Sequence, residues 1–429
     1  MRTRIVLCLT AALVACDDPV SPVVSTPATR RVAAIATESD ALAISANIQR
    51  LHIPYGTIID PVFASPDPLS PDFTRHVSYS RAGDAAIWTG HYLAAEAFRY
   101  AVTRSREALR NVRHTIVGIE GLVEVTGTDV LARFYIPTTS PYVADITEGE
   151  QKHTRREGTI NGEPYYWWGN TSRDQYSGVF FGLGVAYDFV DDARIQRRIA
   201  RIVTRLLDFL LVHGWNVVMP DGDISTTFNG RADQQLSLLQ VGRRVNPQRF
   251  ATIYAAHRAA LGAEVPGPIT GECLDTHNSY FKFNLDHINL YNLIRLEEPL
   301  SPWLPFYMQA FTTLRGCTGD HQNAHFNMID RGVRGPDAAR EAETERLLEL
   351  WLLRPRRDYF VDLRGEYAAC PDHETENRSC EIIPVDRRVN TDFLWQRSPR
   401  QLFGGGAGHI ETAGIDYILP YWMKRWYEQ

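Results

Sequence analysis

Residues 84–103, DAAIWTGHYLAAEAFRYAVT, are rich in alanine, apolar on most sides of a helix, and polar or aromatic at their start. The segment after them has a single apolar stripe at helical spacing, made by Leu109, Val112, Ile116, Ile119 and Val123. A helix that is apolar all round is buried, whereas a helix with one apolar stripe covers a core from outside. The two segments therefore predict an inner helix followed by an outer helix, which Ser105 caps and Gly127 ends.

The same alternation returns along the chain. Residues 174–190, DQYSGVFFGLGVAYDFV, carry Gly178, Gly182 and Gly184, which permit close helix contact, and an outer stripe follows at 195–209. Further pairs are predicted at 232–241 with 247–261, 281–297 with 302–314, and 321–330 with 336–353, and the last helix at 416–427. About six such hairpins predict an all-α fold, a closed (α/α)6 toroid. Short β-hairpins are expected only in loops, at 131–136, 164–168 and 216–224, and the glycine-rich run 404–408 is expected to be flexible.

In this pattern the chain resembles the six-hairpin, (α/α)6-toroid enzymes of carbohydrate metabolism. These include unsaturated glucuronyl hydrolases, several glycosidases, sugar epimerases and toroid polysaccharide lyases. The resemblance covers residues 84–427 and rests on the helix alternation and on aromatic and acidic helix starts. It implies a carbohydrate or polysaccharide as the ligand, and a site at the mouth where the inner helices begin. It points to no single catalytic family, and a fold alone does not fix a function.

The N-terminal stretch MRTRIVLCLTAALVACDD predicts export. Arg2 and Arg4 precede an apolar run that is shorter than the roughly 20 residues needed to span a bilayer, as in a signal peptide. The run ends in Leu13-Val14-Ala15-Cys16, which resembles the lipobox of bacterial lipoproteins and implies lipidation of Cys16 after cleavage. We therefore assign residues 1–15 to a signal peptide, 16–45 to a flexible tether and 46–429 to a single toroid domain. The expected location is the cell envelope, with the protein held at the membrane by its lipid.

Charge and cysteine content narrow the function further. The chain has 45 basic and 51 acidic side chains, and this balance argues against nucleic acid as a partner. Export leads to an oxidising compartment, where an even number of cysteines predicts disulfides. Cys370 and Cys380 would close a local loop, and Cys273 and Cys317 would form the second bridge. The spacing lacks the Cys-x-x-Cys pattern of a zinc site, so neither a metal nor a cofactor is expected.

Two aspartates at inner-helix starts, Asp84 and Asp174, are the candidate catalytic pair. Glycoside cleavage commonly uses one carboxylic acid to protonate the leaving oxygen and one carboxylate to activate water or attack carbon. An apolar, tryptophan-rich setting would raise one pKa for the acid role. The structural alternative is that each aspartate caps its helix.

Aromatic, amide and charged side chains near the same helix starts are the candidate substrate contacts, because sugar rings stack on aromatic faces and their hydroxyls need hydrogen-bond partners. The set is Trp88, His91, Tyr92, Trp168, Arg173, Tyr176, His277, Asn278, Lys282, His287, Asn323, Trp395, Arg397 and Asp416, with Asp392 beside them.

The stretch His321-Gln-Asn-Ala-His325 places two histidines on one helix face, and His325 is a candidate general base. Gln322 stands where the zinc-binding HExxH pattern has glutamate, which disfavours a metal.

Three functions therefore stay open. The leading one is a glycoside hydrolase-like enzyme that uses the paired aspartates. The second is a uronate lyase, in which Asn278 or Arg397 would neutralise the substrate carboxylate and His325 or Tyr280 would remove a proton. The third is a non-catalytic surface lipoprotein that binds a glycan or a protein.

Overall fold

The computed structural model describes residues 35–275, 279–368, 370 and 378–429. The predicted signal peptide, Cys16 and most of the predicted tether lie outside the described residues, and so do His277 and Asn278. The described chain is mostly helical, with small antiparallel sheets, and belongs to one compact unit. Among its helices, none combines the length and apolar character needed to cross a bilayer.

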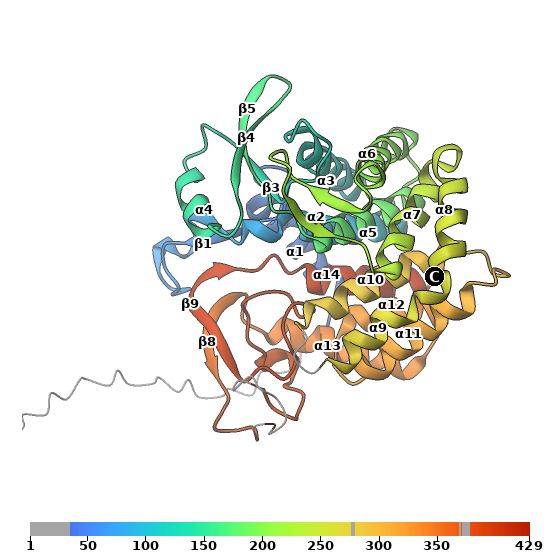
Figure 1. The fold of residues 1–429 in the computed structure, drawn as a ribbon. Helices are drawn as coiled ribbons and strands as arrows, with labels where there is room; N and C mark the ends of the chain where they lie inside the picture. The colour runs from blue at the N-terminus through green and yellow to red at the C-terminus, as the bar shows by residue number, and fades with distance from the viewer. Residues whose placement is uncertain (1–34, 276–278, 369, 371–377) are drawn as a thin grey trace, which may run out of the picture. The chain divides into compact units, whose positions relative to one another are not determined.

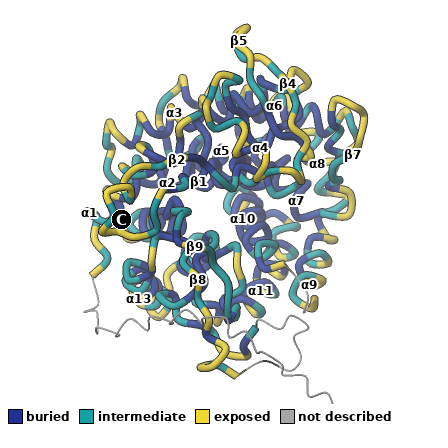
Figure 2. The backbone as a smooth tube through the Cα atoms, turned by 90° about the vertical axis from the view of Figure 1, so that its left-hand side faces the viewer, coloured by how far each residue is buried: buried dark blue, intermediate teal, exposed yellow. Residues whose placement is uncertain are grey.

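The core helices contact one another in a closed succession. Each of them packs against the next, and α14 in turn packs against α2 (Figure 1). They are α2 (Ala85–Thr103), α5 (Arg173–Phe189), α7 (Ala232–Val245), α10 (Phe281–Arg295), α12 (Ala324–Arg334) and α14 (Ile415–Tyr427). The segments predicted to be apolar all round are thus the buried helices, as the dark tube of α2, α5 and α10 in Figure 2 shows.

Each of the first five core helices is followed by a helix that packs against it from outside. These outer helices are α3 (Arg106–Glu124), α6 (Ala193–Val212), α8 (Pro247–Leu261), α11 (Leu304–Thr318) and α13 (Ala338–Leu353). Ser105 caps α3 by accepting a hydrogen bond from the Glu107 amide at 3.1 Å, as the sequence predicted. The remaining helices are α4 (Val143–Gly149), α9 (Pro266–Leu274), the π-helix η1 (Ile48–His52) and the 3-10 helices η2 (Pro71–Thr74), η3 (Ala82–Asp84), η4 (Gly262–Glu264) and η5 (Val385–Arg387).

Most of the first helix, α1 (Glu38–Asn47), lies in the segment 16–45 that the sequence assigned to a tether. A capping box between Thr37 and Asp40 starts this helix, and the helix packs against α14. The folded domain therefore begins several residues earlier than predicted, because the polar residues around Thr37 form a helix start.

Helices α2 and α5 approach each other at backbone distance. A Cβ added to Gly90 would lie 1.9 Å from the carbonyl oxygen of Gly178, and one added to Gly182 would lie 2.2 Å from that of Gly90. Only glycine permits this contact, which fixes the starts of both helices side by side.

A four-stranded antiparallel sheet joins the two ends of the described chain, and the sequence did not predict it. Its order is β2 (His76–Ser80), β1 (Asp60–Phe63), β9 (Phe403–Glu411) and β8 (Arg357–Asp362). The expectation of a flexible run at 404–408 was wrong, because these glycines lie in β9. Gly405 has a φ of 115°, and a Cβ there would lie 2.3 Å from the Tyr359 carbonyl oxygen, so glycine is what lets β9 pair closely with β8.

The smaller sheets contain the strands predicted in loops, together with β4, which the sequence did not predict. One contains β3 (Phe134–Pro137), β5 (Glu163–Trp168) and β4 (Arg155–Ile160), and the other contains β6 (Asn216–Val218) and β7 (Ile224–Thr227).

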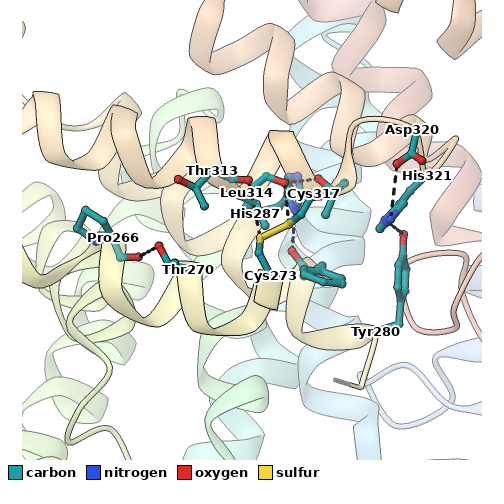
Figure 3. Close-up of a disulfide and its surroundings, with 12 residues drawn as sticks. Pro266, Thr270, Cys273, Tyr280, His287, Thr313, Leu314, Cys317, Asp320 and His321 are labelled. Carbon is teal, nitrogen blue, oxygen red and sulfur yellow. Dashed lines mark hydrogen bonds and ion pairs between the residues drawn. A yellow bond between two sulfur atoms is a disulfide. The ribbon is translucent and has the colours of Figure 1, made fainter. Parts of the chain in front are cut away.

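Both disulfides predicted from the sequence are present. Cys273–Cys317 joins the end of α9 to α11 (Figure 3), and Cys370–Cys380 closes a local loop.

Candidate functional site

Three adjoining cavities lie where core helices begin. The Asp84 cavity, of about 300 Å³, includes Asp84 and Trp88 from the start of α2. The Tyr280 cavity, of about 410 Å³, shares Gln396 and Arg397 with it. The Asp174 cavity, of about 120 Å³, shares Phe281 with the Tyr280 cavity. Polar starts of α2, α5, α7 and α10 therefore line neighbouring cavities, and the larger two are within the usual size range of ligand pockets.

Asp84 stands at the junction of η3 and α2, but its side chain does not cap the helix. Its Oδ1 accepts a hydrogen bond from Gln175 Nε2 at 3.0 Å and lies 3.4 Å from Nη1 of Arg133. The side chain is 36% exposed and lines the Asp84 cavity. The structure thus leaves this carboxyl available to a ligand.

The pKa of Asp84 is raised to about 7. Partial burial is the main cause, followed by the negative charge of Asp174, while Arg133 opposes the shift and Asp392 and Glu150 add to it. A carboxyl group with a pKa near 7 is partly protonated at neutral pH, so it can serve there as a general acid.

Asp174 is a neighbour of Asp84, but it faces a different cavity. Its Oδ1 accepts hydrogen bonds from the hydroxyl of Ser172 and from the amide of Gln175. Arg133 donates a 2.5 Å hydrogen bond to the same Ser172 hydroxyl and another to Asp84. Gln175 donates one hydrogen bond to each aspartate. Asp174 lines the Asp174 cavity together with Arg173 and Lys282.

Three other carboxylates line the cavity of Asp84, those of Asp60, Glu150 and Asp392. Asp392 is 13% exposed and accepts a 2.6 Å hydrogen bond from Arg397, and its burial raises its pKa. Glu150 pairs with His153 at 2.9 Å. A Cβ on Gly83 would lie 2.5 Å from Oε2 of Glu150, so the glycine beside Asp84 allows this close approach.

The cavity wall also contains an aromatic and a strained residue. Trp88 packs edge-on against Phe393 with ring centroids 5.0 Å apart. Arg81 has a φ of 60° and is held by Asp60 at 3.1 Å. Such a conformation is uncommon for a residue other than glycine and is typical of sites whose surroundings fix a side chain.

Many of the predicted substrate contacts are instead fully or almost fully buried. This applies to His91, Tyr92, Trp168, Tyr176, His287, Asn323, Trp395 and Asp416, each at most 3% exposed. They hold the helix starts together: Tyr176 accepts from the Leu131 amide, and Asp416 accepts from the Leu394 amide. The sequence places a residue in a first turn but does not say whether it faces the mouth or a neighbouring helix.

His325, the candidate general base, is 1% exposed and lies against Trp395, with ring centroids 4.8 Å apart. Both of its ring nitrogens lack a hydrogen-bond partner among the described residues, and burial holds its pKa well below the ordinary value. His325 is therefore neutral and enclosed in this conformation. His321 is also buried, and it lies 3.3 Å from the hydroxyl of Tyr280, a residue that lines the Tyr280 cavity (Figure 3).

One recess thus contains a carboxyl group with a raised pKa, three further carboxylates and the indole of Trp88, which is 5% exposed. Sequence reasoning missed two of these carboxylates, Glu150 and Asp60. Glu150 follows α4 in a loop and Asp60 begins β1, so neither carries a helix-start signal. Within the described residues, no group of three or more histidine, cysteine, aspartate or glutamate side chains is placed to hold a metal ion. Comparison of the chain with protein-family models, curated proteins and solved structures gives no match.

Proposed function

We propose that the protein is a glycoside hydrolase-like enzyme that acts on carbohydrate with Asp84 as its proton donor. The observation that carries this proposal is the Asp84 carboxyl, which has a pKa of about 7 and lines a cavity shared with three other carboxylates. Two carboxyl groups in different protonation states are what glycoside cleavage requires.

The fold that we propose is an (α/α)6 toroid. The closed succession of contacts from α2 through α14 supports it, and so does the outer helix that follows each of the first five core helices. In such a ring the core helices begin at one mouth, which agrees with the three adjoining cavities at their starts.

In the proposed mechanism Asp84 donates its proton to the leaving glycosidic oxygen. Asp392 is the second carboxylate, which would activate a water molecule or attack the anomeric carbon as the glycosidic bond breaks. It lines the same cavity, and although burial raises its pKa, the positive charges of Arg81 and Arg397 oppose that shift. Asp174 is not in that cavity, and its charge instead keeps Asp84 protonated. The role that the sequence gave to Asp174 therefore moves to Asp392, while Trp88 offers an apolar edge to the sugar ring.

The test is turnover of pooled oligosaccharides and polysaccharides, with a glycan array to identify what binds. Asp84→Asn is expected to lower turnover by about 10²–10⁴-fold, the usual contribution of a general acid. Asp67→Asn, a change at an exposed loop residue, is the matched control. Normal turnover by Asp84→Asn would overturn the proposal, and binding without turnover by the parent would favour a non-catalytic glycan-binding protein.

One observation favours the uronate lyase as a second candidate. Tyr280 lies in the cavity that contains Arg397, and its hydroxyl is within 3.3 Å of His321. Arg397 would neutralise the substrate carboxylate while Tyr280 exchanges a proton with carbon. The pKa of Tyr280 is raised to about 12 by burial, which opposes the base role and leaves the hydrolase preferred. Release of an unsaturated product, visible by its ultraviolet absorbance, would favour the lyase.

We also propose that the protein is exported and anchored by lipid at Cys16. The support is the lipobox-like sequence alone. Cys16→Ser should release the protein from the membrane fraction, and continued membrane association would contradict lipidation there.

A further inference from the structure

A groove lies between the outer helices α3 and α6, apart from the cavities described above. It encloses about 470 Å³, and its described lining residues are five arginines and two isoleucines. Four of the arginines come from α6, where their spacing repeats along one face, and Arg113 comes from α3. The structure thus gathers arginines from two outer helices around one groove.

The positive charge of this groove is only partly neutralised. Arg113 pairs with Asp192 at 2.6 Å, and Arg198 and Arg201 share a single carboxylate, that of Glu120, at 2.9 and 2.5 Å. Arg194 and Arg197 form no ion pair with any residue in the described part of the chain. Five guanidinium groups therefore face two carboxylates, on a chain whose formal net charge is −6.

The lining of the groove also has an apolar part. Ile116 is 1% exposed and Ile195 is 4% exposed, whereas Arg194 and Arg197 are exposed. Guanidinium groups bind phosphate oxygens in a planar, two-pronged geometry. A ligand that carries a phosphate beside an apolar portion matches both features of the groove, and membrane phospholipids have this composition.

We propose that this groove docks onto the anionic phospholipid headgroups of the membrane, with a phosphate held by Arg194 and Arg197. The net negative charge of the protein is repelled by an anionic membrane surface, whereas a local cluster of positive charge is attracted to it. The face that contains the groove is therefore expected to turn towards the bilayer. The predicted anchor makes the membrane accessible, because the 19 residues from Cys16 to the first described residue reach at most about 65 Å when fully extended. The docking is independent of the proposed enzymatic function.

The experiment uses residues 16–429 with Cys16→Ser, which removes the lipid. Co-sedimentation is measured with vesicles of phosphatidylcholine alone and of an equimolar mixture with phosphatidylglycerol. Binding to the mixed vesicles is expected, together with weaker binding at high salt. Arg194→Gln with Arg197→Gln should weaken it about 25-fold, at about fivefold for each arginine near an anionic surface. Both side chains are exposed and unpaired in the described structure, so the fold is preserved.

Arg75→Gln with Arg346→Gln is the matched control. It removes the same charge from two exposed arginines outside the groove, and it should leave vesicle binding unchanged. An equal loss of vesicle binding in the two double variants would overturn the proposal. Failure of the parent protein to bind the mixed vesicles would also overturn it. A third arm adds inorganic phosphate alone. Phosphate binding that requires Arg194 and Arg197, without any vesicle binding, would assign the groove to a soluble phosphate ligand and reject the membrane.

Discussion

The side-chain amide of Gln175 donates a 3.0 Å hydrogen bond to Oδ1 of Asp84 and so ties the start of α5 to the start of α2. The side-chain oxygen of Gln175 accepts a 3.0 Å hydrogen bond from the backbone amide of Ile87. The close backbone contact at Gly90 brings the two helices near enough for this pairing. The position of the proposed proton donor therefore depends on a packing feature of the core.

The pH profile of turnover should report the charge of Asp174. Asp84 acts as a protonated acid, so activity is expected to fall as pH rises through about 7. Asp174→Asn removes a negative charge that raises the Asp84 pKa, and it should move this alkaline limb to lower pH. Asp67→Asn is the control. An unshifted limb in Asp174→Asn would show that the two carboxylates are not electrostatically linked.

Asp84→Asn should stabilise the protein at alkaline pH. The folded-state pKa of Asp84, about 7, lies above its ordinary value of 3.8, so folding favours the protonated form. The stability linked to this proton is present below the ordinary value and is lost as pH rises through the folded value. Thermal unfolding should therefore show a higher Tm for the asparagine variant than for the parent above pH 7, and a smaller difference in acid. An equal difference at all pH values would contradict the raised pKa.

Gly90→Ala should destabilise the fold, because its Cβ would lie 1.9 Å from the Gly178 carbonyl oxygen. The expected cost is about 1–3 kcal/mol or more in the free energy of unfolding, measured with denaturant. Gly316→Ala is the matched control within α11, since a Cβ there meets nothing within 4 Å. That control should gain about 0.5–1 kcal/mol from helix propensity. Equal effects at both positions would mean that α2 and α5 are not in backbone contact.

The two disulfides should differ in their contribution to stability. Cys273 and Cys317 are 44 residues apart, and Cys370 and Cys380 are 10 apart. Loop-closure entropy predicts a loss of about 4 kcal/mol when the first bridge is removed by serine substitution, and about 3 kcal/mol for the second. Chemical denaturation of the two double-serine variants measures both. A larger loss from the short loop would contradict this order.

Most of the helical framework could be predicted, because burial leaves a periodic mark on the sequence. The stripe through Ile116 and the all-round apolar run before it distinguish α3 from α2. The sheet of β8 and β9 could not be predicted, since the glycines that permit its close pairing remove the alternation that marks a strand. Start-of-helix reasoning found Asp84, but it also selected His325, which the rotation of α12 turns into the core. Trp395 and Arg397 lie in the loop before β9, where Trp395 is buried and Arg397 lines the cavity. Rotation about the helix axis depends on tertiary packing.

The most direct test of the proposed proton donor is an infrared titration of its carboxyl group, taken as the difference between the parent and Asp84→Asn. We predict that the C=O band of a protonated carboxyl is present below neutrality, disappears with a midpoint near pH 7, and is absent from the variant. A midpoint near the ordinary value of 3.8 would contradict the assignment of Asp84 as the general acid.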